Sequence, residues 1–417
     1  MLLDTNLVDV NARDADGATP LHLASERGHT SVVKFLVDRD DIELNPRDVT
    51  GKTPLQCASD GDWGDARQLL LNRGAFNIYQ RTLQGGHADS IEGVAFSHDS
   101  ALIASGSSDF TVKIWDRITG RCQKSLEGHN GIVNAVAFSH DSTLIASASD
   151  DSTIRIWNTT TGQCQQLLRG PRSDISVEAV AFSHDSKLII SGSSDNTLKM
   201  WDASTGRALK SLTGHNATIY AVAFSHNDDL MISGSGDGVV ILWNLVEGTS
   251  NVLETHTGII GSVAFSENSL YFYTSSQDGT VRSWSSTSGQ CQQILRGHRG
   301  PVSSVAISPT SPTSPTFIAS GSLDETVKIW EADTGICRQT FASKGAGVRA
   351  IAFSHDANFV VSGLSDGTLK IWDMWLAFYA SSMNPQRDEE QVEKRLLEME
   401  VQGNDQIQEL RILLRHN

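Results

Sequence analysis

Histidine, serine and aspartate recur together along this 417-residue chain, and these residue types can form the triad of a nucleophilic enzyme. His87, Ser105 and Asp109 are the first such set. Because the set returns at regular intervals, it indicates part of a repeated structure rather than one activated nucleophile. We therefore predict that these residues support the fold and that the protein is not an enzyme.

Two other kinds of site are suggested by short motifs. Gly51-Lys52-Thr53 matches the end of a phosphate-binding loop, but the leading glycine of that motif falls on Pro46. The five cysteines include no Cys-x-x-Cys pair, which argues against a zinc site and a disulfide framework. One histidine follows a Phe-Ser pair in each of five repeats, which indicates a repeat signature rather than a converging set of metal ligands: His98, His140, His184, His226 and His355. We predict no metal and no other cofactor.

The chain is acidic, with a formal net charge of −16 at pH 7. This charge repels the phosphates of nucleic acids and of anionic membranes, so we expect neither as a partner. No run of residues approaches the ~18 apolar residues that a membrane span requires. The first residues carry acids instead of the basic start of a signal peptide, and the odd cysteine count fits a reducing compartment, so we predict a cytoplasmic protein.

Seven segments of similar length each end in a tryptophan. Successive tryptophans are 42, 44, 42, 41, 46 and 42 residues apart: Trp115, Trp157, Trp201, Trp243, Trp284, Trp330 and Trp372. The first segment predicts four short strands, around 94–96, 102–104, 111–115 and 122–126. A sheet of this size cannot bury both faces alone, but seven sheets stacked radially can.

The segment ends carry a recognisable signature. Gly-His opens four segments, at His87, His129, His215 and His298, and Trp-Asp or Trp-Asn closes five. In these motifs the chain resembles the WD40 family across residues 79–373. The resemblance implies a mainly β fold with a seven-bladed β-propeller, which we place at residues 79–380.

In the WD40 family a buried His, Ser or Thr, Asp and Trp form a hydrogen-bonded chain within each blade. The resemblance assigns this tetrad to five blades here: His87, Ser105, Asp109 and Trp115; His129, Ser147, Asp151 and Trp157; His215, Ser233, Asp237 and Trp243; His256, Thr274, Asp278 and Trp284; His298, Ser320, Asp324 and Trp330. Blades three and seven lack the histidine, because Pro171 and Gly345 stand in its place. We expect these two blades to be the least stable, or to use water.

The chain ends of the propeller suggest how the ring closes. Tyr79 to Leu83 (YQRTL) resembles the fourth strand Cys122 to Leu126 (CQKSL), yet nothing before it completes a blade. After Trp372 the Thr-Gly turn that leads into a fourth strand is missing. We infer that Tyr79 to Leu83 completes the last blade, which removes an open sheet edge.

A second repeat type precedes the propeller. Asp16 to Ala24 (DGATPLHLA) recurs 34 residues later as Thr50 to Ala58 (TGKTPLQCA), and each copy is followed by a helical stretch. This resembles the ankyrin family and implies a short all-α segment of about two repeats at residues 1–78. Three repeats are usually needed for stability, so we expect this segment to be marginal by itself.

The last segment, residues 385–417, is charged, and its apolar residues are spaced three and four apart. This pattern predicts an amphipathic C-terminal helix. It is either a solvated tail or a helix that associates with a partner, including a second copy of the chain.

Partners of WD40 propellers usually contact the face that carries the starts of the first strands. We predict that this face binds a peptide with a basic end and an apolar end, and that Tyr220 is the main anchor. The residues assigned to it are Glu92, Ile132, Asn134, Asp150, Glu178, Tyr220, Ile259, Leu323 and Arg349.

The leading functional hypothesis is a non-catalytic scaffold or sensor that binds proteins. The repeats look most like the sensor repeats of fungal signalling ATPases of the NACHT type. Two alternatives are an adaptor of a mitochondrial-fission complex and a substrate receptor of a ubiquitin ligase. The receptor group often shows Trp-Asp-x-Arg, which Trp115-Asp116-Arg117 misses by one position.

Overall fold

The computed structural model describes residues 10–39, 42–44, 46, 48, 52–60, 63, 65–66, 69–70, 80–83, 85–170, 174–253, 256–309 and 316–374. The N-terminal helices and the strands belong to two separate compact units. The helix predicted over 385–417 lies outside the described residues. None of the described helices is long and apolar enough to cross a membrane.

The N-terminal unit contains the short helices α1 (Pro20–Glu26), α2 (Thr30–Val37) and α3 (Pro54–Asp60). Pro20 begins α1, where its missing N–H leaves no intrahelical bond unmade. His22 joins the two repeats, because its Nδ1 accepts from the Thr19 N–H at 3.0 Å and its Nε2 lies 2.9 Å from the Lys52 carbonyl oxygen. The core is small and apolar, with Leu21, Leu36 and Leu70 fully enclosed.

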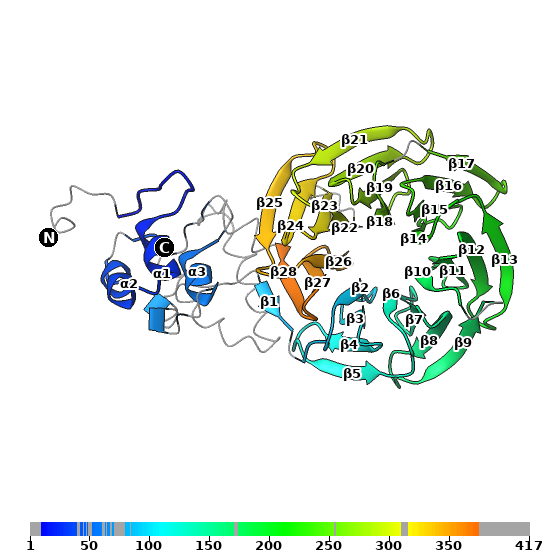
Figure 1. Ribbon diagram of the computed structural model, residues 1–417, viewed down its shortest axis with the longest axis horizontal. Coiled ribbons are helices and arrows are strands. Elements are labelled where there is room, and N and C mark those ends of the chain that lie inside the picture. Colours follow the sequence, from blue (N-terminus) through cyan, green and yellow to red (C-terminus); the bar gives the residue numbers. More distant parts are fainter. Residues whose placement is uncertain are drawn as a thin grey trace. The chain divides into compact units, whose positions relative to one another are not determined.

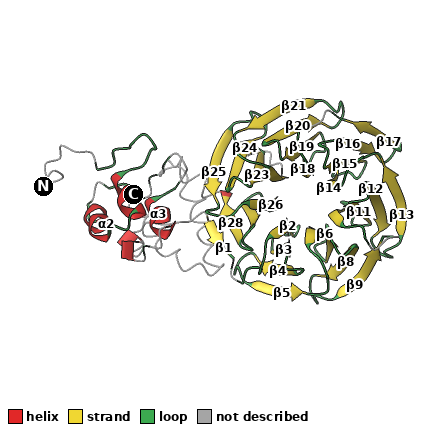
Figure 2. Cartoon of the chain, viewed as in Figure 1, coloured by secondary structure: helices red, strands yellow, loops and turns green. Residues whose placement is uncertain are grey.

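The strands form seven four-stranded antiparallel sheets, which confirms the predicted seven-bladed propeller (Figures 1 and 2). Blade one consists of β2 (Ile91–Phe96), β3 (Leu102–Ser107), β4 (Val112–Asp116) and β5 (Cys122–Leu126). Blade two consists of β6 (Val133–Phe138), β7 (Leu144–Ser149), β8 (Thr153–Asn158) and β9 (Cys164–Arg169). Blade three consists of β10 (Val177–Phe182), β11 (Leu188–Ser193), β12 (Thr197–Asp202) and β13 (Ala208–Thr213). Blade four consists of β14 (Ile219–Phe224), β15 (Leu230–Ser235), β16 (Val240–Asn244) and β17 (Thr249–Val252).

The remaining blades follow the same order from the centre outward (Figure 1). Blade five consists of β18 (Ile260–Phe265), β19 (Tyr271–Ser276), β20 (Thr280–Ser285) and β21 (Cys291–Arg296). Blade six consists of β22 (Val302–Ile307), β23 (Phe317–Ser322), β24 (Thr326–Glu331) and β25 (Cys337–Ala342). Blade seven consists of β26 (Val348–Phe353), β27 (Phe359–Leu364), β28 (Leu369–Asp373) and the early strand β1 (Gln80–Thr82).

The early strand lies at the outer edge of the last blade. The sheet order is β1-β28-β27-β26, and the Leu83 N–H donates to the Leu369 carbonyl oxygen over 3.0 Å. Two segments about 290 residues apart in the sequence therefore share one sheet, and β28 has a hydrogen-bonded neighbour instead of an open edge.

Buried side chains gather between neighbouring blades rather than within one. Val112 and Ile114 of blade one pack in one cluster with Val133 and Trp157 of blade two. The cluster between blades seven and one contains Leu83, Ile91, Phe96, Ile103, Trp115, Phe359, Val361, Leu369 and Ile371. Each blade thus buries its two faces against its neighbours, so the ring as a whole is the folding unit.

Candidate functional site

A chain of hydrogen bonds runs through blade one from the surface turn to the interior tryptophan. His87 Nδ1 lies 2.8 Å from Asp109 Oδ2, and His87 Nε2 lies 2.7 Å from Ser105 Oγ. Trp115 Nε1 donates to the same Ser105 oxygen over 2.8 Å. The structure brings together the equivalent four residues in blades two, five and six: His129, Ser147, Asp151 and Trp157; His256, Thr274, Asp278 and Trp284; His298, Ser320, Asp324 and Trp330.

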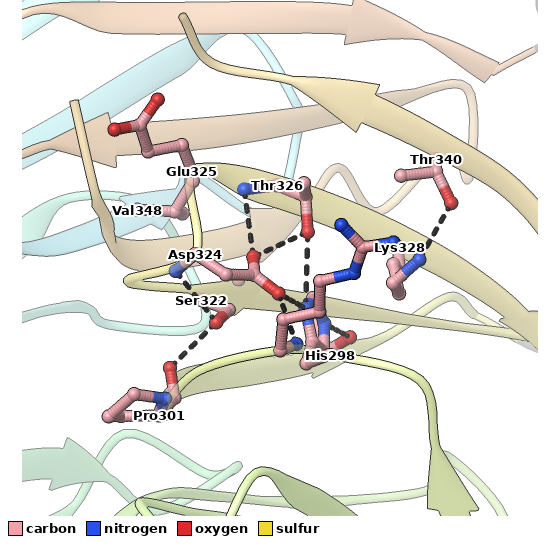
Figure 3. Close-up of polar contacts among 12 residues, drawn as sticks. His298, Pro301, Ser322, Asp324, Glu325, Thr326, Lys328, Thr340 and Val348 are labelled. Carbon is pink, nitrogen blue, oxygen red and sulfur yellow. Dashed lines mark hydrogen bonds and ion pairs between the residues drawn. The ribbon is translucent and has the colours of Figure 1, made fainter. Parts of the chain in front are cut away.

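A threonine that sequence reasoning missed is the fifth member of this network. In blade six, shown in Figure 3, Thr326 Oγ1 donates to Asp324 Oδ1 over 2.6 Å and lies 3.1 Å from His298 Nδ1. Thr111, Thr153 and Thr280 do the same in blades one, two and five. A threonine two residues after the turn aspartate was the signal that could have identified it.

Burial and hydrogen bonding set the protonation of these groups. Burial alone would raise the pKa of Asp109. Hydrogen bonds from Thr111 and the charge of His87 outweigh this effect and lower the pKa to about 2. Burial lowers the pKa of His87 despite its aspartate partner. At neutral pH the network therefore contains a carboxylate and a neutral imidazole, whose two nitrogens both have partners.

The network has the hydrogen-bond order of a catalytic triad, but its serine cannot act as a nucleophile on an external substrate. Ser105 is fully buried and bonded to both His87 and Trp115. Ser365 stands in a Gly-x-Ser-x-Gly sequence, yet it lies between two strands rather than in the strand-to-helix turn of a hydrolase. Its Oγ accepts a hydrogen bond from the Gly347 N–H at 3.0 Å.

Blade four departs from the predicted tetrad. His215 Nε2 lies 2.7 Å from Ser233 Oγ and Trp243 Nε1 donates to Ser233 over 2.8 Å, but His215 Nδ1 is buried and has no hydrogen-bond partner in the described part of the chain. Val239 occupies the threonine position, so no hydroxyl bridges His215 and Asp237. Asp237 accepts from the Ser235 hydroxyl instead, and burial lowers the pKa of His215 to about 4.

In blades three and seven, which lack the histidine, the hydroxyl of the network serine donates a hydrogen bond to a backbone carbonyl oxygen instead. Ser191 Oγ donates to the Lys199 carbonyl oxygen over 3.4 Å, and Ser362 Oγ donates to that of Lys370 over 3.5 Å. Both distances are long for a hydroxyl donor. Pro171 lies outside the described residues. In blade three a cavity of about 10 Å³ touches Ser191, Ser193 and Trp201, close to the volume that one water needs.

The residues predicted to bind a partner lie at the starts of the first strands and in the turns between the second and third strands. Two of the acidic residues in this set, Glu92 and Asp150, already interact with nearby polar side chains. Ser108 Oγ donates to Glu92 over 3.1 Å, and Arg349 Nη1 lies 4.0 Å from the same carboxylate across the junction of blades seven and one. Asn134 Nδ2 donates to Asp150 over 2.8 Å and to the Val177 carbonyl oxygen over 3.1 Å.

Glu178 and Asp150 form an acidic pair between blades two and three. Burial raises the pKa of Glu178, the charge of Asp150 raises it further, and the Ser176 hydroxyl opposes both by donating to it. Asp150 is exposed and Glu178 is half-buried. A cation placed here would relieve the repulsion between the two carboxylates.

The apolar members of the predicted set are exposed to different degrees. Tyr220 is 37% exposed and Leu323 is 38% exposed, whereas Ile132 and Ile259 are half-buried. The Tyr220 ring packs over Gly236, where a Cβ would lie 3.1 Å from the ring. Tyr220 and Leu323 are therefore the apolar side chains of this set that offer most area to a partner.

The histidines of the Phe-Ser-His turns lie close together in the ring. The imidazoles of His140 and His184 lie 3.7 Å apart between ring centroids, and those of His184 and His226 also 3.7 Å. They are neighbours because residues at the same position of successive repeats lie next to one another around the axis of a ring. Among the described residues, no group of three or more His, Cys, Asp or Glu side chains has the arrangement to hold a metal ion.

Comparisons with known proteins match both repeat types. The family described as "WD domain, G-beta repeat" matches residues 78–116, 120–158, 162–202, 206–244, 248–285, 289–331 and 335–373. The family described as "Ankyrin repeats (3 copies)" matches residues 1–81. A curated relative, "Acyl-CoA-binding domain-containing protein 2" from Arabidopsis thaliana, is 54% identical over 33 residues, which are 8% of this chain and 9% of that protein. The chain thus spans less than a tenth of that relative's length.

Proposed function

Because the chain belongs to the WD40 repeat family, with ankyrin repeats before its propeller, we propose that it is a non-catalytic scaffold that binds protein partners. The partner site is the propeller face formed by the starts of the first strands. The observation that carries the assignment is the pairing of acidic and apolar groups on this face. Repeat folds of both kinds typically act through such surfaces and not through catalysis.

The acidic pair Asp150 and Glu178 provides the charged end of the site. Two carboxylates in a partly buried setting favour a cationic group, since the pKa of Glu178 is raised by burial and by Asp150. Glu92 is less suited, because Arg349 already lies 4.0 Å from its carboxylate. We therefore place the basic end of the ligand over blades two and three.

Tyr220 and Leu323 provide the apolar end. Aromatic side chains contribute much of the binding energy in protein interfaces because they bury a large area with few rotatable bonds. Tyr220 is the second residue of β14, the first strand of blade four, and this blade follows the acidic pair in blade order. A peptide with a basic residue followed by an apolar one fits this order.

The test measures the binding of a labelled peptide library to the full-length chain and to variants. Each peptide in the library has one position restricted to basic residues and one restricted to apolar residues. Tyr220→Ala is expected to weaken the selected peptide about 30-fold, as a loss of ~2 kcal/mol implies. Glu178→Gln is expected to weaken basic peptides and to reduce the salt dependence of their binding. Leu209→Ala, at an exposed position on the outer strand β13, is the control. Unchanged binding in a Tyr220→Ala, Glu178→Ala double variant would rule out this face.

No contact among the described residues favours the two alternatives, an adaptor of a mitochondrial-fission complex or a substrate receptor of a ubiquitin ligase. Arg117, which nearly completes a ubiquitin-ligase receptor signature, is packed within the ring. Its Nε donates to the Ser100 carbonyl oxygen over 2.6 Å, and its guanidinium lies 4.5 Å from the centroid of the Phe359 ring. The self-association proposed for residues 385–417 remains a prediction, because that segment lies outside the described residues.

For localisation we propose a reducing intracellular compartment. Two of the five cysteines, Cys164 and Cys337, are exposed free thiols. Exposed free thiols are kept reduced in the cytosol and tend to oxidise outside the cell.

A further inference from the structure

The opposite face of the propeller carries a cluster of imidazoles around the axis. The Phe-Ser-His turns follow the first strands, so they lie one strand length, roughly 17 Å, from the partner face proposed above. Neighbouring ring centroids are separated by 4.1, 4.0, 3.7 and 3.7 Å in the order His355, His98, His140, His184 and His226. We call these five residues, from blades seven, one, two, three and four, the histidine arc.

The backbone of the arc is held by the next blade in the ring. The amide N–H groups of His98, His140 and His226 donate to Ser142, Ser186 and Ser269 over 3.0, 2.8 and 3.0 Å. The His184 amide donates to Asp228 over 2.7 Å. These four acceptors have positive φ angles between 57° and 61°, so tight turns aim their side chains at the neighbouring turn. The spacing of the imidazoles is therefore a property of the scaffold.

A cavity of about 140 Å³ opens beside the arc. It is lined by four histidines of the arc and four aromatic rings of the first strands: His98, His140, His184, His226, Phe138, Phe182, Phe224 and Phe265. A cavity of nearly this volume, ~150 Å³, holds one benzene molecule in another protein. The space thus suits a flat group of about six heavy atoms between aromatic faces.

The imidazoles of His98, His140, His184 and His355 are neutral at physiological pH. Burial lowers the pKa of His98 to about 3, and the neighbouring histidines lower it further. Burial also lowers the pKa values of His140, His184 and His355. A neutral imidazole has one nitrogen that accepts a hydrogen bond. Nδ1 of His98 and of His140 are buried and have no hydrogen-bond partner among the described residues.

The charges around the arc are mainly negative. Asp141 and Asp228 act on His140, Asp185 and Glu267 act on His184, and Asp356 acts on His355. Asp99 lies within electrostatic range of His355. The nearby cations are already paired: Lys187 with Asp185 at 2.9 Å and Arg117 with Asp356 at 4.0 Å. This field favours a positive ligand and disfavours an anion.

We propose that the cavity beside the histidine arc binds the guanidinium group of an arginine in a basic segment of a partner protein. A guanidinium is flat, stacks on aromatic rings and carries five N–H donors. It would stack on the imidazole and phenyl rings that line the cavity, and its charge would be balanced by the surrounding carboxylates. An ammonium group lacks the flat face, so lysine fits this cavity less well. The inference does not depend on the partner face described above.

The test compares two fluorescein-labelled, end-blocked peptides, Ala-Gly-Arg-Gly-Ala and the same peptide with citrulline, on the full-length chain. Citrulline keeps the shape of arginine but has no charge and one donor group fewer. We expect the arginine peptide to bind at least tenfold more tightly by fluorescence anisotropy. Both titrations contain a chelator, so that an adventitious metal cannot bridge the imidazoles. Equal binding of the two peptides, or no binding in the chelator, would overturn the proposal.

Variants locate the binding in the cavity. His184→Ala removes a central ring of the arc and is expected to weaken arginine-peptide binding at least tenfold. Glu267→Gln keeps the side-chain shape, and we expect it to weaken binding severalfold even if the histidine variant does not fold. Leu209→Ala on β13 is the matched control and should bind as the parent does. Full affinity in a folded His184→Ala variant, or in Glu267→Gln, would place the peptide elsewhere.

Discussion

Single residues decide how complete the internal network of each blade is. A histidine, a serine or threonine, an aspartate and a tryptophan are present in five blades, yet in blade four His215 Nδ1 has no hydrogen-bond partner within the residues that the structure describes. Blade four is also the one of these five that has valine, at position 239, where the others have threonine. One hydroxyl group therefore separates a satisfied buried imidazole from an unsatisfied one, and the latter carries a cost of ~1–3 kcal/mol.

Val239→Thr is expected to stabilise the protein by ~1 kcal/mol, because its hydroxyl can bridge Asp237 and His215 as Thr326 does in blade six. Urea unfolding followed by tryptophan fluorescence measures the change. Thr326→Val is the reciprocal variant and should lose a similar amount. If Val239→Thr lowers the unfolding free energy while Thr326→Val also lowers it, the hydroxyl alone does not explain the difference.

Stability should fall as the solution is acidified from about pH 6.5 toward pH 4. The pKa values of His215 and His98 are lowered to about 4 and about 3, whereas the same residues in the unfolded chain titrate near pH 6.5. Between these values the unfolded chain binds more protons, so acid favours unfolding. His215→Gln should reduce the slope of unfolding free energy against pH near pH 5 by about one proton. An unchanged slope in this variant would contradict the assignment.

At the scale of elements, ring closure depends on contacts between blades one and seven. The His87 N–H donates to the Gly367 carbonyl oxygen over 2.9 Å, and β1 lies beside β28. Gly367 has a φ of +81°, and a Cβ there would overlap the His87 carbonyl group. Glycine is thus required at this turn for two reasons: the backbone is left-handed, and the two blades approach too closely to leave room for a side chain.

Gly367→Ala is therefore expected to destabilise the propeller by ~3 kcal/mol, as the sum of backbone strain and a steric clash at the closure. Gly345→Ala is the matched control, because Gly345 also has a positive φ, of +85°, but a Cβ there meets nothing within 4 Å. The control should cost only ~1–2 kcal/mol. Equal losses in the two variants, measured by urea unfolding, would show that the closure tolerates the extra methyl group.

On the scale of the whole molecule, the chain combines a small helical unit with a large closed ring. The helical core contains few fully enclosed side chains, among them Leu21, Leu36 and Leu70. In the ring, each blade packs against two neighbours, so burial is shared by all seven. The two units should therefore differ in stability, because the area buried on folding grows with the size of the unit.

We expect calorimetry of the full-length chain to show two transitions, with the helical unit unfolding first. Leu21→Ala removes a fully buried side chain of that unit and should lower only the first transition, by ~2–5 kcal/mol. Val32→Ala, at a position that is 45% exposed on α2, is the control and should change neither transition appreciably. A single transition shifted by Leu21→Ala would mean that the two units unfold together.

The sequence by itself determined the repeats and the blade number, and its resemblance to the WD40 family assigned four of the five members of the internal network. The repeats and the blade number follow from local patterns that return at a fixed period, such as the Gly-His and Trp-Asp pairs, and a period can be read without knowing any contact. The threonine of the network was also visible at its fixed position, but its role depends on a hydrogen bond to a histidine 24 residues earlier.

Only the tertiary structure decided which side chains from different blades meet. The sequence places His98, His140, His184, His226 and His355 at equal positions of separate repeats, which indicated a repeat signature and not a set of metal ligands. In the ring, equal positions near the axis become neighbours, and the imidazoles stand 3.7–4.1 Å apart. Likewise, the ion pair of Arg349 with Glu92 forms because closure brings the last blade against the first. Distances around a closed ring depend on its radius, which no local sequence pattern contains.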